Sequence, residues 1–167
     1  MRGAAILSAL AVVGAAAGLS ACGFTPLYAD PAVGSPLRRI AVIGQDDRLG
    51  YRLREQLEDA LAWDRSATPL YRLETQVRQS RRPLGRRIDD TATRYELTVK
   101  ADWTLTPATG GTPVSGSETV TTTYAAADQP YAAIAAQQDG EERAAAELSR
   151  MIRLDLAQAL NQGPAGR

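Results

Sequence analysis

The chain has 167 residues, with 19 basic and 19 acidic side chains, one cysteine and no histidine. This length suits a single domain behind an export signal. The balanced charge excludes the bulk electrostatic attraction on which many nucleic-acid-binding proteins depend, so we expect no nucleic-acid partner. The missing histidine removes the commonest general base and metal ligand. We therefore expect no catalytic site, no metal site and no cofactor.

The N-terminal segment, residues 1–21, is predicted to be a signal peptide. Arg2 provides a short basic start, and an apolar run without charged residues follows from Ala4 to Ala21. A run of this length is in principle able to span a bilayer. Its alanines and glycines, however, make it weakly hydrophobic for a permanent anchor. A basic residue followed by an uncharged apolar run is the pattern of a secretion signal.

The apolar run ends at Leu19-Ser20-Ala21-Cys22, which resembles the bacterial lipobox. In lipoproteins the lipobox cysteine takes a diacylglycerol, becomes the first residue after cleavage and is then acylated at its amine. The alternative is a chance cysteine at the end of an ordinary signal. A lone cysteine in an exported protein has no disulfide partner, and lipidation explains it better. We predict that Cys22 is lipidated, because two or more acyl chains anchor a protein stably.

Residues 22–36 are predicted to be an extended, lipidated tether, because they contain three prolines and two glycines and no helical period. Phe24 and Tyr28 lie in this tether and are available to pack on a partner. The β-branched run from Leu37 to Ile43 predicts a buried strand. Asp46 or Asp47 is then suited to cap a helix that reaches about Trp63. Four leucines at four-residue spacing predict the face that this helix buries: Leu49, Leu53, Leu57 and Leu61.

Three strands and a second helix are predicted in the rest of the chain. Tyr71–Val77 and Arg94–Leu105 alternate apolar and polar residues, which is typical of half-exposed strands. A threonine-rich strand is expected from about Val114 to Tyr124. Pro130 suits the first turn of a last helix, and Gly163-Pro164 ends it. The predicted domain covers residues 37–162 and is followed by a short tail, residues 163–167.

The predicted order is β-α-β-β-β-α. A sheet with one polar and one apolar face needs a cover on its apolar side, and two amphipathic helices are available to form that cover. We therefore predict an α+β fold, a two-layer sandwich in which a four-stranded mixed sheet carries two helices on one face.

Basic residues concentrate between the first two long strands, where Pro83 and Gly85 predict a loop. A loop tip can present several guanidinium groups to a phosphorylated ligand, whereas a solvated, solubilising loop is the alternative. Membrane attachment favours the first interpretation, because the neighbouring surfaces carry phosphates. The candidate ligand-binding residues are Arg78, Arg81, Arg82, Arg86 and Arg87.

The start of the mature chain, Cys22-Gly23-Phe24-Thr25-Pro26-Leu27-Tyr28, resembles the opening of LptE-like lipoproteins of alphaproteobacteria. The segment Asp47-Arg48-Leu49-Gly50, the stretch from Tyr131 to Ala144 and the predicted element order are similar to that family as well. The resemblance covers most of the mature chain. Its opening heptapeptide is the most specific part, since the helical segments alone are generic.

The resemblance implies a function in lipopolysaccharide transport. The chain would be the lipoprotein subunit of the outer-membrane lipopolysaccharide translocon, plugging an LptD-type β-barrel, assisting its assembly and binding lipopolysaccharide during delivery to the cell surface. Gly23 resembles an outer-membrane sorting signal, so we expect an anchor on the periplasmic side of the outer membrane. The predicted polar face of the sheet suits the polar interior of a barrel. Its residues are Arg72, Glu74, Arg78, Arg94, Glu96, Lys100 and Asp102.

Two other classes of function stay open at the level of the sequence. The chain is also compatible with a lipoprotein accessory subunit of another envelope complex, such as an ABC-type transporter or a cell-wall synthase. An envelope enzyme is the third hypothesis. The missing histidine, and a cysteine already assigned to lipidation, argue against it.

Overall fold

The computed structural model describes residues 35–86 and 92–162. The signal peptide, Cys22, most of the tether, Arg87 and the tail lie outside these ranges, so the predictions made for them stay predictions. Within the described ranges, no helix is long and apolar enough to cross a bilayer.

The described chain forms a four-stranded mixed sheet and two long helices, as predicted. The strands are ordered β1-β2-β3-β4. β1 pairs with β2 in parallel, and the other two pairs are antiparallel. The elements are β1 (Ile40–Ile43), α3 (Arg48–Ala60), β2 (Tyr71–Arg86), β3 (Ala92–Pro107), β4 (Val114–Ala125) and α4 (Pro130–Gln162).

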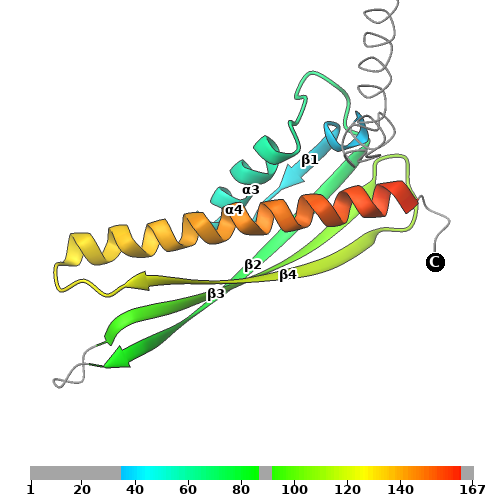
Figure 1. The fold of residues 1–167 in the computed structure, drawn as a ribbon. Coiled ribbons are helices and arrows are strands. Elements are labelled where there is room, and N and C mark those ends of the chain that lie inside the picture. Colours follow the sequence, from blue (N-terminus) through cyan, green and yellow to red (C-terminus); the bar gives the residue numbers. More distant parts are fainter. Residues whose placement is uncertain (1–34, 87–91, 163–167) are drawn as a thin grey trace, which may run out of the picture.

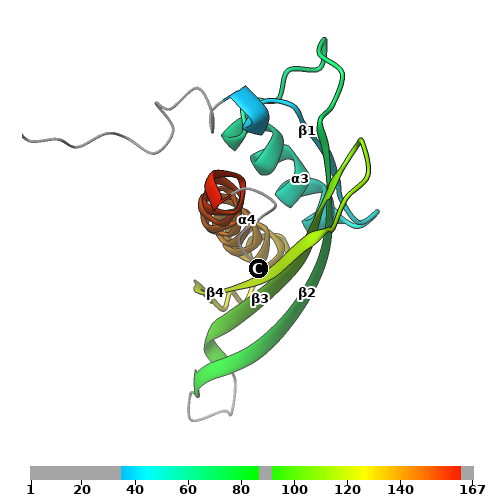
Figure 2. The same ribbon diagram turned by 90° about the vertical axis from the view of Figure 1, so that its right-hand side faces the viewer.

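Both helices lie on the concave side of the curved sheet, which confirms the predicted two-layer arrangement (Figures 1 and 2). α4 runs along β4, whereas α3 packs between α4 and the β1–β2 end of the sheet. The core fills the space between these layers because both helices are amphipathic. Its largest fully buried side chains are Ile40, Leu53, Leu57, Leu73, Leu148, Ile152, Leu156 and Val99.

α3 begins where the sequence predicts, because Asp47 caps it. The Asp47 carboxylate accepts a hydrogen bond of 2.6 Å from the backbone N–H of Gly50. Such a bond satisfies one of the free N–H groups of the first helical turn. The four leucines of the predicted apolar stripe, from Leu49 to Leu61, are all buried. The cap and the stripe thus fix the start and the orientation of the helix.

Each strand of the sheet presents alternate side chains to the helices and to solvent. In β3 the helix-facing residues include Leu97, Val99 and Trp103, all buried. Trp103 lies against Gly116 in β4, where an added Cβ atom would collide with the indole. The other face is polar along β2, β3 and β4, as expected for a sheet with one solvated face.

Two predicted boundaries were wrong. The first strand begins at Ile40 and not at Leu37, because residues 35–37 form a helical turn. Pro36, whose ring fixes φ near the helical value, suits that turn. In the second case the arginine-rich segment is not a loop, because β2 continues to Arg86 and pairs with Ala92 of β3. β1 pairs with β2 only as far as Glu74, so Pro83 lies on an open sheet edge, where proline is tolerated.

The long strands separate two ends of the molecule. At one end Tyr71 pairs with both Ile40 and Pro107, so the chain enters the domain there. We call this the entry end. At the other end, the distal end, Arg86 pairs with Ala92, close to the start of α4 (Figure 1). Strands of 16 residues extend about 50 Å. The arginine-rich segment is therefore far from the point where the tether joins the domain.

Candidate functional site

The predicted arginine cluster is divided between the two faces of β2. Arg78 and Arg82 belong to the outer face, opposite Lys100 and Glu96 of β3. Arg81 belongs to the inner face, opposite the buried Leu97. Arg86 ends the strand, and Arg87 lies outside the described residues. The structure therefore does not gather the five arginines at one loop tip.

On the outer face the two arginines are paired with carboxylates. Arg82 Nη2 lies 2.8 Å from Glu96 Oε1, and Arg78 forms an ion pair with Asp102. Hydrogen bonds from Lys100 and Arg78 lower the pKa of the Asp102 carboxyl below its usual value. These pairs are exposed and screened by solvent, and each of the two arginines has a carboxylate within ion-pair distance, although Arg78 shares Asp102 with Lys100.

Arg81, in contrast, contacts only neutral groups among the residues that the structure describes. Its guanidinium carbon lies 4.7 Å from the centre of the Tyr95 ring, within the range of a cation–π contact. Its Nη1 lies 3.5 Å from both Tyr124 Oη and Gln137 Oε1. The hydrogen bond with Tyr124 raises the pKa of Arg81 above its usual value. Arg81 is therefore permanently charged, and none of these three partners neutralises it.

A cavity of about 310 Å³ opens beside Arg81, between the distal end of the sheet and the first turns of α4. Tyr95, Tyr124 and several alanines provide apolar surface, and Asp128 contributes a carboxylate to the lining. Ile134 also lines the cavity and is 54% exposed, while Tyr131, one turn earlier on α4, is 90% exposed. The cavity thus joins one guanidinium group to an apolar wall and an exposed apolar rim.

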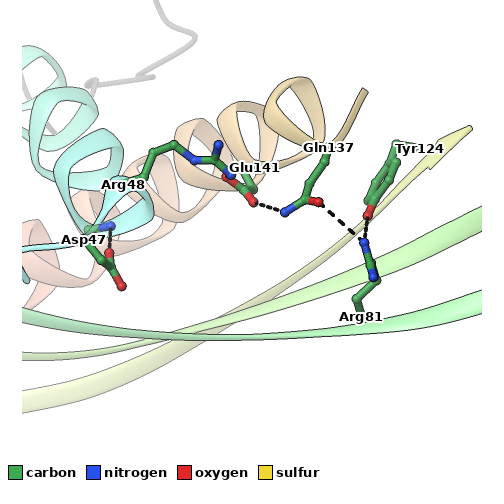
Figure 3. A network of polar contacts seen from close by, with 7 residues as sticks. Asp47, Arg48, Arg81, Tyr124, Gln137 and Glu141 are labelled. Carbon is green, nitrogen blue, oxygen red and sulfur yellow. Dashed lines mark hydrogen bonds and ion pairs between the residues drawn. The ribbon is translucent and has the colours of Figure 1, made fainter. Parts of the chain in front are cut away.

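Arg81 is connected through Gln137 to an ion pair between the buried Glu141 and the half-exposed Arg48 (Figure 3). Gln137 Nε2 donates a hydrogen bond of 2.8 Å to Glu141 Oε1. The other carboxylate oxygen of Glu141 accepts from Arg48 Nη2 at 2.6 Å. The Glu141 side chain is only 3% exposed. These polar contacts therefore form a continuous network from the start of α3, across α4, to the cavity at the distal end.

A second cavity, of about 280 Å³, lies at the entry end and has a different character. Its lining includes Tyr71, Leu105, Val114 and Leu160, together with the β3–β4 turn, and it contains no charged residue. The distal cavity is the one that combines a cation with apolar surface. This combination suits an amphiphilic anion, because a concave site orients its ligand through a few polar groups in an apolar wall.

Sequence reasoning identified Arg81 but placed it in a loop. It did not identify Tyr124, Gln137 or Glu141 as part of a site. One signal for the placement of Arg81 was present. Arg81 is separated from the buried Leu73 and Val77 of β2 by an even number of residues. If the strand continues to Arg81, its side chain must point to the same inner face.

Comparisons with known proteins agree with this fold. The model of the LptE family, described as lipopolysaccharide-assembly, matches residues 37–156. A crystal structure of a lipoprotein from Caulobacter crescentus CB15 is similar, with a TM-score of 0.66 and 46% sequence identity. The match covers 77% of this chain and 96% of that one. Rare lipoprotein B from Shewanella oneidensis aligns with a TM-score of 0.39 and 15% identity, over 74% of this chain and 86% of that chain.

No curated protein matches the chain. The family model, however, covers well over half of its residues. The matched range contains the four strands of the sheet, α3 and α4 as far as Leu156. The Caulobacter structure adds close sequence identity over nearly all of its own length. The chain therefore belongs to the LptE family of lipopolysaccharide-assembly lipoproteins.

Proposed function

We propose that this protein is the lipoprotein subunit of an outer-membrane lipopolysaccharide translocon. In this proposal it is anchored through Cys22 on the periplasmic side, plugs an LptD-type β-barrel and assists its assembly. It binds lipopolysaccharide at the distal cavity and catalyses no reaction. Membership of the LptE family supports the pathway. The observation that carries the binding site is the position of Arg81 beside an amphiphilic cavity, with contacts to neutral groups among the described residues.

The outer face of the sheet supports the barrel partner. The side chains of Arg78, Arg82, Lys100 and Asp102 on this face form ion pairs with neighbours on the same face. β4 adds a row of exposed serine and threonine residues. A surface of this kind can contact a hydrated, polar barrel interior without burying an unpaired charge.

In this proposal, lipid A carries the phosphates and acyl chains that complement the charge and the apolar surface of the distal cavity. Its phosphates would pair with Arg81, because guanidinium–phosphate hydrogen bonds are charge-assisted. Its acyl chains would contact Ile134, Tyr131 and the alanine-rich wall. In this proposal Arg78, Arg82, Arg86 and Arg87 of the predicted cluster act at longer range, by increasing the positive potential at the distal end.

Co-purification tests the partner. The full-length protein, tagged at its C-terminus, is purified from detergent-solubilised envelopes and its partners are identified by mass spectrometry. We expect a large outer-membrane β-barrel at near-equal amounts. Recovery of an ABC-type transporter or a cell-wall synthase without a barrel would contradict the proposal and favour the alternative of an accessory subunit.

Binding of purified lipopolysaccharide tests the site. Arg81→Gln is compared with Arg82→Gln, which removes the same charge from the neighbouring residue on the opposite face. We expect Arg81→Gln to weaken binding by roughly tenfold, as the loss of a charge-assisted hydrogen bond predicts. Arg82→Gln should weaken it less than about twofold. Equal losses in both variants, or no loss in either, would exclude the distal cavity as the binding site.

A further inference from the structure

The partner that α4 presents to Arg81 is neutral, although a carboxylate lies one turn away. Gln137 occupies the position 3.5 Å from Arg81 Nη1, and Glu141 follows four residues later on the same face of the helix. A glutamate at position 137 would pair with Arg81 directly. The chain instead places its negative charge where it reaches Arg48.

The orientation of the Gln137 amide is fixed by Glu141. A carboxylate accepts hydrogen bonds and does not donate them. Glu141 Oε1 therefore requires the NH2 group of Gln137, which it receives at 2.8 Å. The amide oxygen must then point the other way, towards Arg81 (Figure 3). The reversed amide would leave two acceptors facing each other and two donors facing each other, so one orientation satisfies both neighbours.

The charge of Glu141 is in turn compensated from α3. Arg48 Nη2 lies 2.6 Å from Glu141 Oε2, and the Glu141 side chain is only 3% exposed. A buried carboxylate without such a partner would be strongly unfavourable. The pair therefore allows Glu141 to hold the amide without leaving a free negative charge beside the cavity.

We propose that Gln137 is a positioning residue that sets the specificity of the distal cavity for anionic ligands, with Glu141 and Arg48 as its support. Its neutral oxygen directs the Arg81 guanidinium but does not neutralise it, so that the charge is left for a phosphate group. This inference rests on the proposed function, in which the phosphates of lipopolysaccharide bind at Arg81. It adds that the identity of residue 137 determines whether that binding occurs.

The decisive variant is Gln137→Glu in the mature lipoprotein, with binding of purified lipopolysaccharide as the measurement. The new carboxylate would pair with Arg81 and compete with the ligand, so we expect roughly tenfold weaker binding. Gln138→Glu is the matched control, because it adds the same charge at the neighbouring, exposed residue. We expect the control to lose less than about twofold.

The pH dependence separates this mechanism from simple damage to the fold. Glutamic acid has an unperturbed pKa of about 4.3; the facing carboxylate of Glu141 would raise the pKa of the introduced side chain, whereas pairing with Arg81 would lower it. Binding by Gln137→Glu should therefore recover towards that of the parent protein as the pH falls and the new carboxylate becomes protonated. Gln137→Leu provides a second variant, since it removes the acceptor and adds no charge. We expect it to weaken binding only two- to fourfold, because the hydrogen bond that it removes from Arg81 is long, at 3.5 Å.

The outcomes distinguish this inference from the proposed function. If Arg81→Gln weakens binding but Gln137→Glu behaves like Gln138→Glu, the cavity is the site and the role of Gln137 is wrong. If Arg81→Gln itself has no effect, the proposed site is wrong. If Gln137→Glu does not fold, full binding by a folded Gln137→Leu would still overturn the inference.

Discussion

Arg81 and Arg82 are neighbours in the sequence but have opposite surroundings. Arg82 points to the outer face, where Glu96 neutralises it in solvent. Arg81 points to the inner face, where two tyrosines and an amide hold it beside a cavity. The strand period alone produces this difference, because successive side chains point to opposite faces. The partners of an arginine, and not the number of arginines nearby, therefore determine whether its charge is available to a ligand.

The largest expected effect is a loss of folding stability when a carboxylate is placed on the helix-covered face of the sheet. Val120 faces α4 and is 8% exposed, whereas its neighbour Thr119 is exposed on the outer face. Val120→Asp would bury a carboxylate without a partner. We expect a loss of about 3 kcal/mol or more in the free energy of unfolding, measured by urea titration of the soluble domain.

Thr119→Asp is the control for this prediction. It adds the same side chain on the outer face, opposite Lys100 of β3. Opposite charges across a strand pair are neutral to slightly stabilising, so the stability should change by less than about 0.5 kcal/mol. A similar loss in both variants would show that β4 is not covered on one face only.

The same alternation explains how far the fold could be predicted from the sequence. The period of two in Arg94–Leu105 and the leucine stripe from Leu49 to Leu61 record which faces are buried, and both were confirmed. The continuation of β2 was missed because Pro83 and Gly85 are typical of loops. Gly85 does adopt a positive φ of 63°, but the long pairing with β3 accommodates it.

The site was less predictable, because it depends on how separate elements are placed against one another. Gln137 meets Arg81 only because α4 lies along the distal end of the sheet. Glu141 meets Arg48 only because α3 packs on α4. These pairs are separated by 56 and 93 residues in the chain. No local pattern records such distances, whereas the inward position of Arg81 follows from strand period.

The second prediction tests the packing that supports Arg81 on the inner face. Gly140 of α4 lies against Tyr124, and a Cβ atom there would come within 3.1 Å of the ring. Gly140→Val adds a branched side chain to this contact, so we expect a loss of about 1–3 kcal/mol from overpacking. Displacement of Tyr124 should also weaken lipopolysaccharide binding. Stability is measured by urea denaturation, and the affinity for purified lipopolysaccharide is measured on the same variant.

Gly140→Ala is the informative comparison. Alanine favours a helix over glycine by about 1 kcal/mol, and this gain opposes the closer contact with Tyr124. We expect stability near that of the parent protein and binding reduced less than in Gly140→Val. A stabilised Gly140→Val would mean that the Tyr124 ring is free to move and does not hold Arg81.

The third prediction concerns a carboxylate on the inner face. Burial, and then a hydrogen bond with Asp155 of α4, raises the pKa of Glu118 above its usual value. A raised pKa contributes stability below the unfolded pKa that is lost as the pH rises through the folded pKa. At neutral pH the two carboxylates therefore oppose folding. We expect Glu118→Gln to raise the unfolding temperature by a few degrees at pH 7.5.

The size of this effect should change with pH in a defined way. Because the pKa of Glu118 is raised in the folded protein, the advantage of the glutamine should shrink as the pH falls and Glu118 becomes protonated. Glu142→Gln serves as the control, since Glu142 is exposed. An advantage of Glu118→Gln that is constant from pH 4 to pH 7.5 would exclude repulsion from Asp155 as its cause.

The smallest effect is expected on the outer face, at Arg78. Its partner Asp102 is half-buried and is also contacted by Lys100, whose Nζ lies 3.0 Å from Asp102 Oδ1. The pKa of Asp102 is lowered by both cations, so its contribution to stability exists above the unfolded pKa and fades as the pH falls.

Arg78→Gln leaves Lys100 in place, and solvent screens the lost pair. We therefore expect an unfolding temperature within about one degree of the parent at pH 7.5, and lipopolysaccharide binding close to that of Arg82→Gln. A loss of binding as large as that of Arg81→Gln would mean that the ligand contacts the outer face, because Arg78 is separated from the distal cavity by the sheet itself.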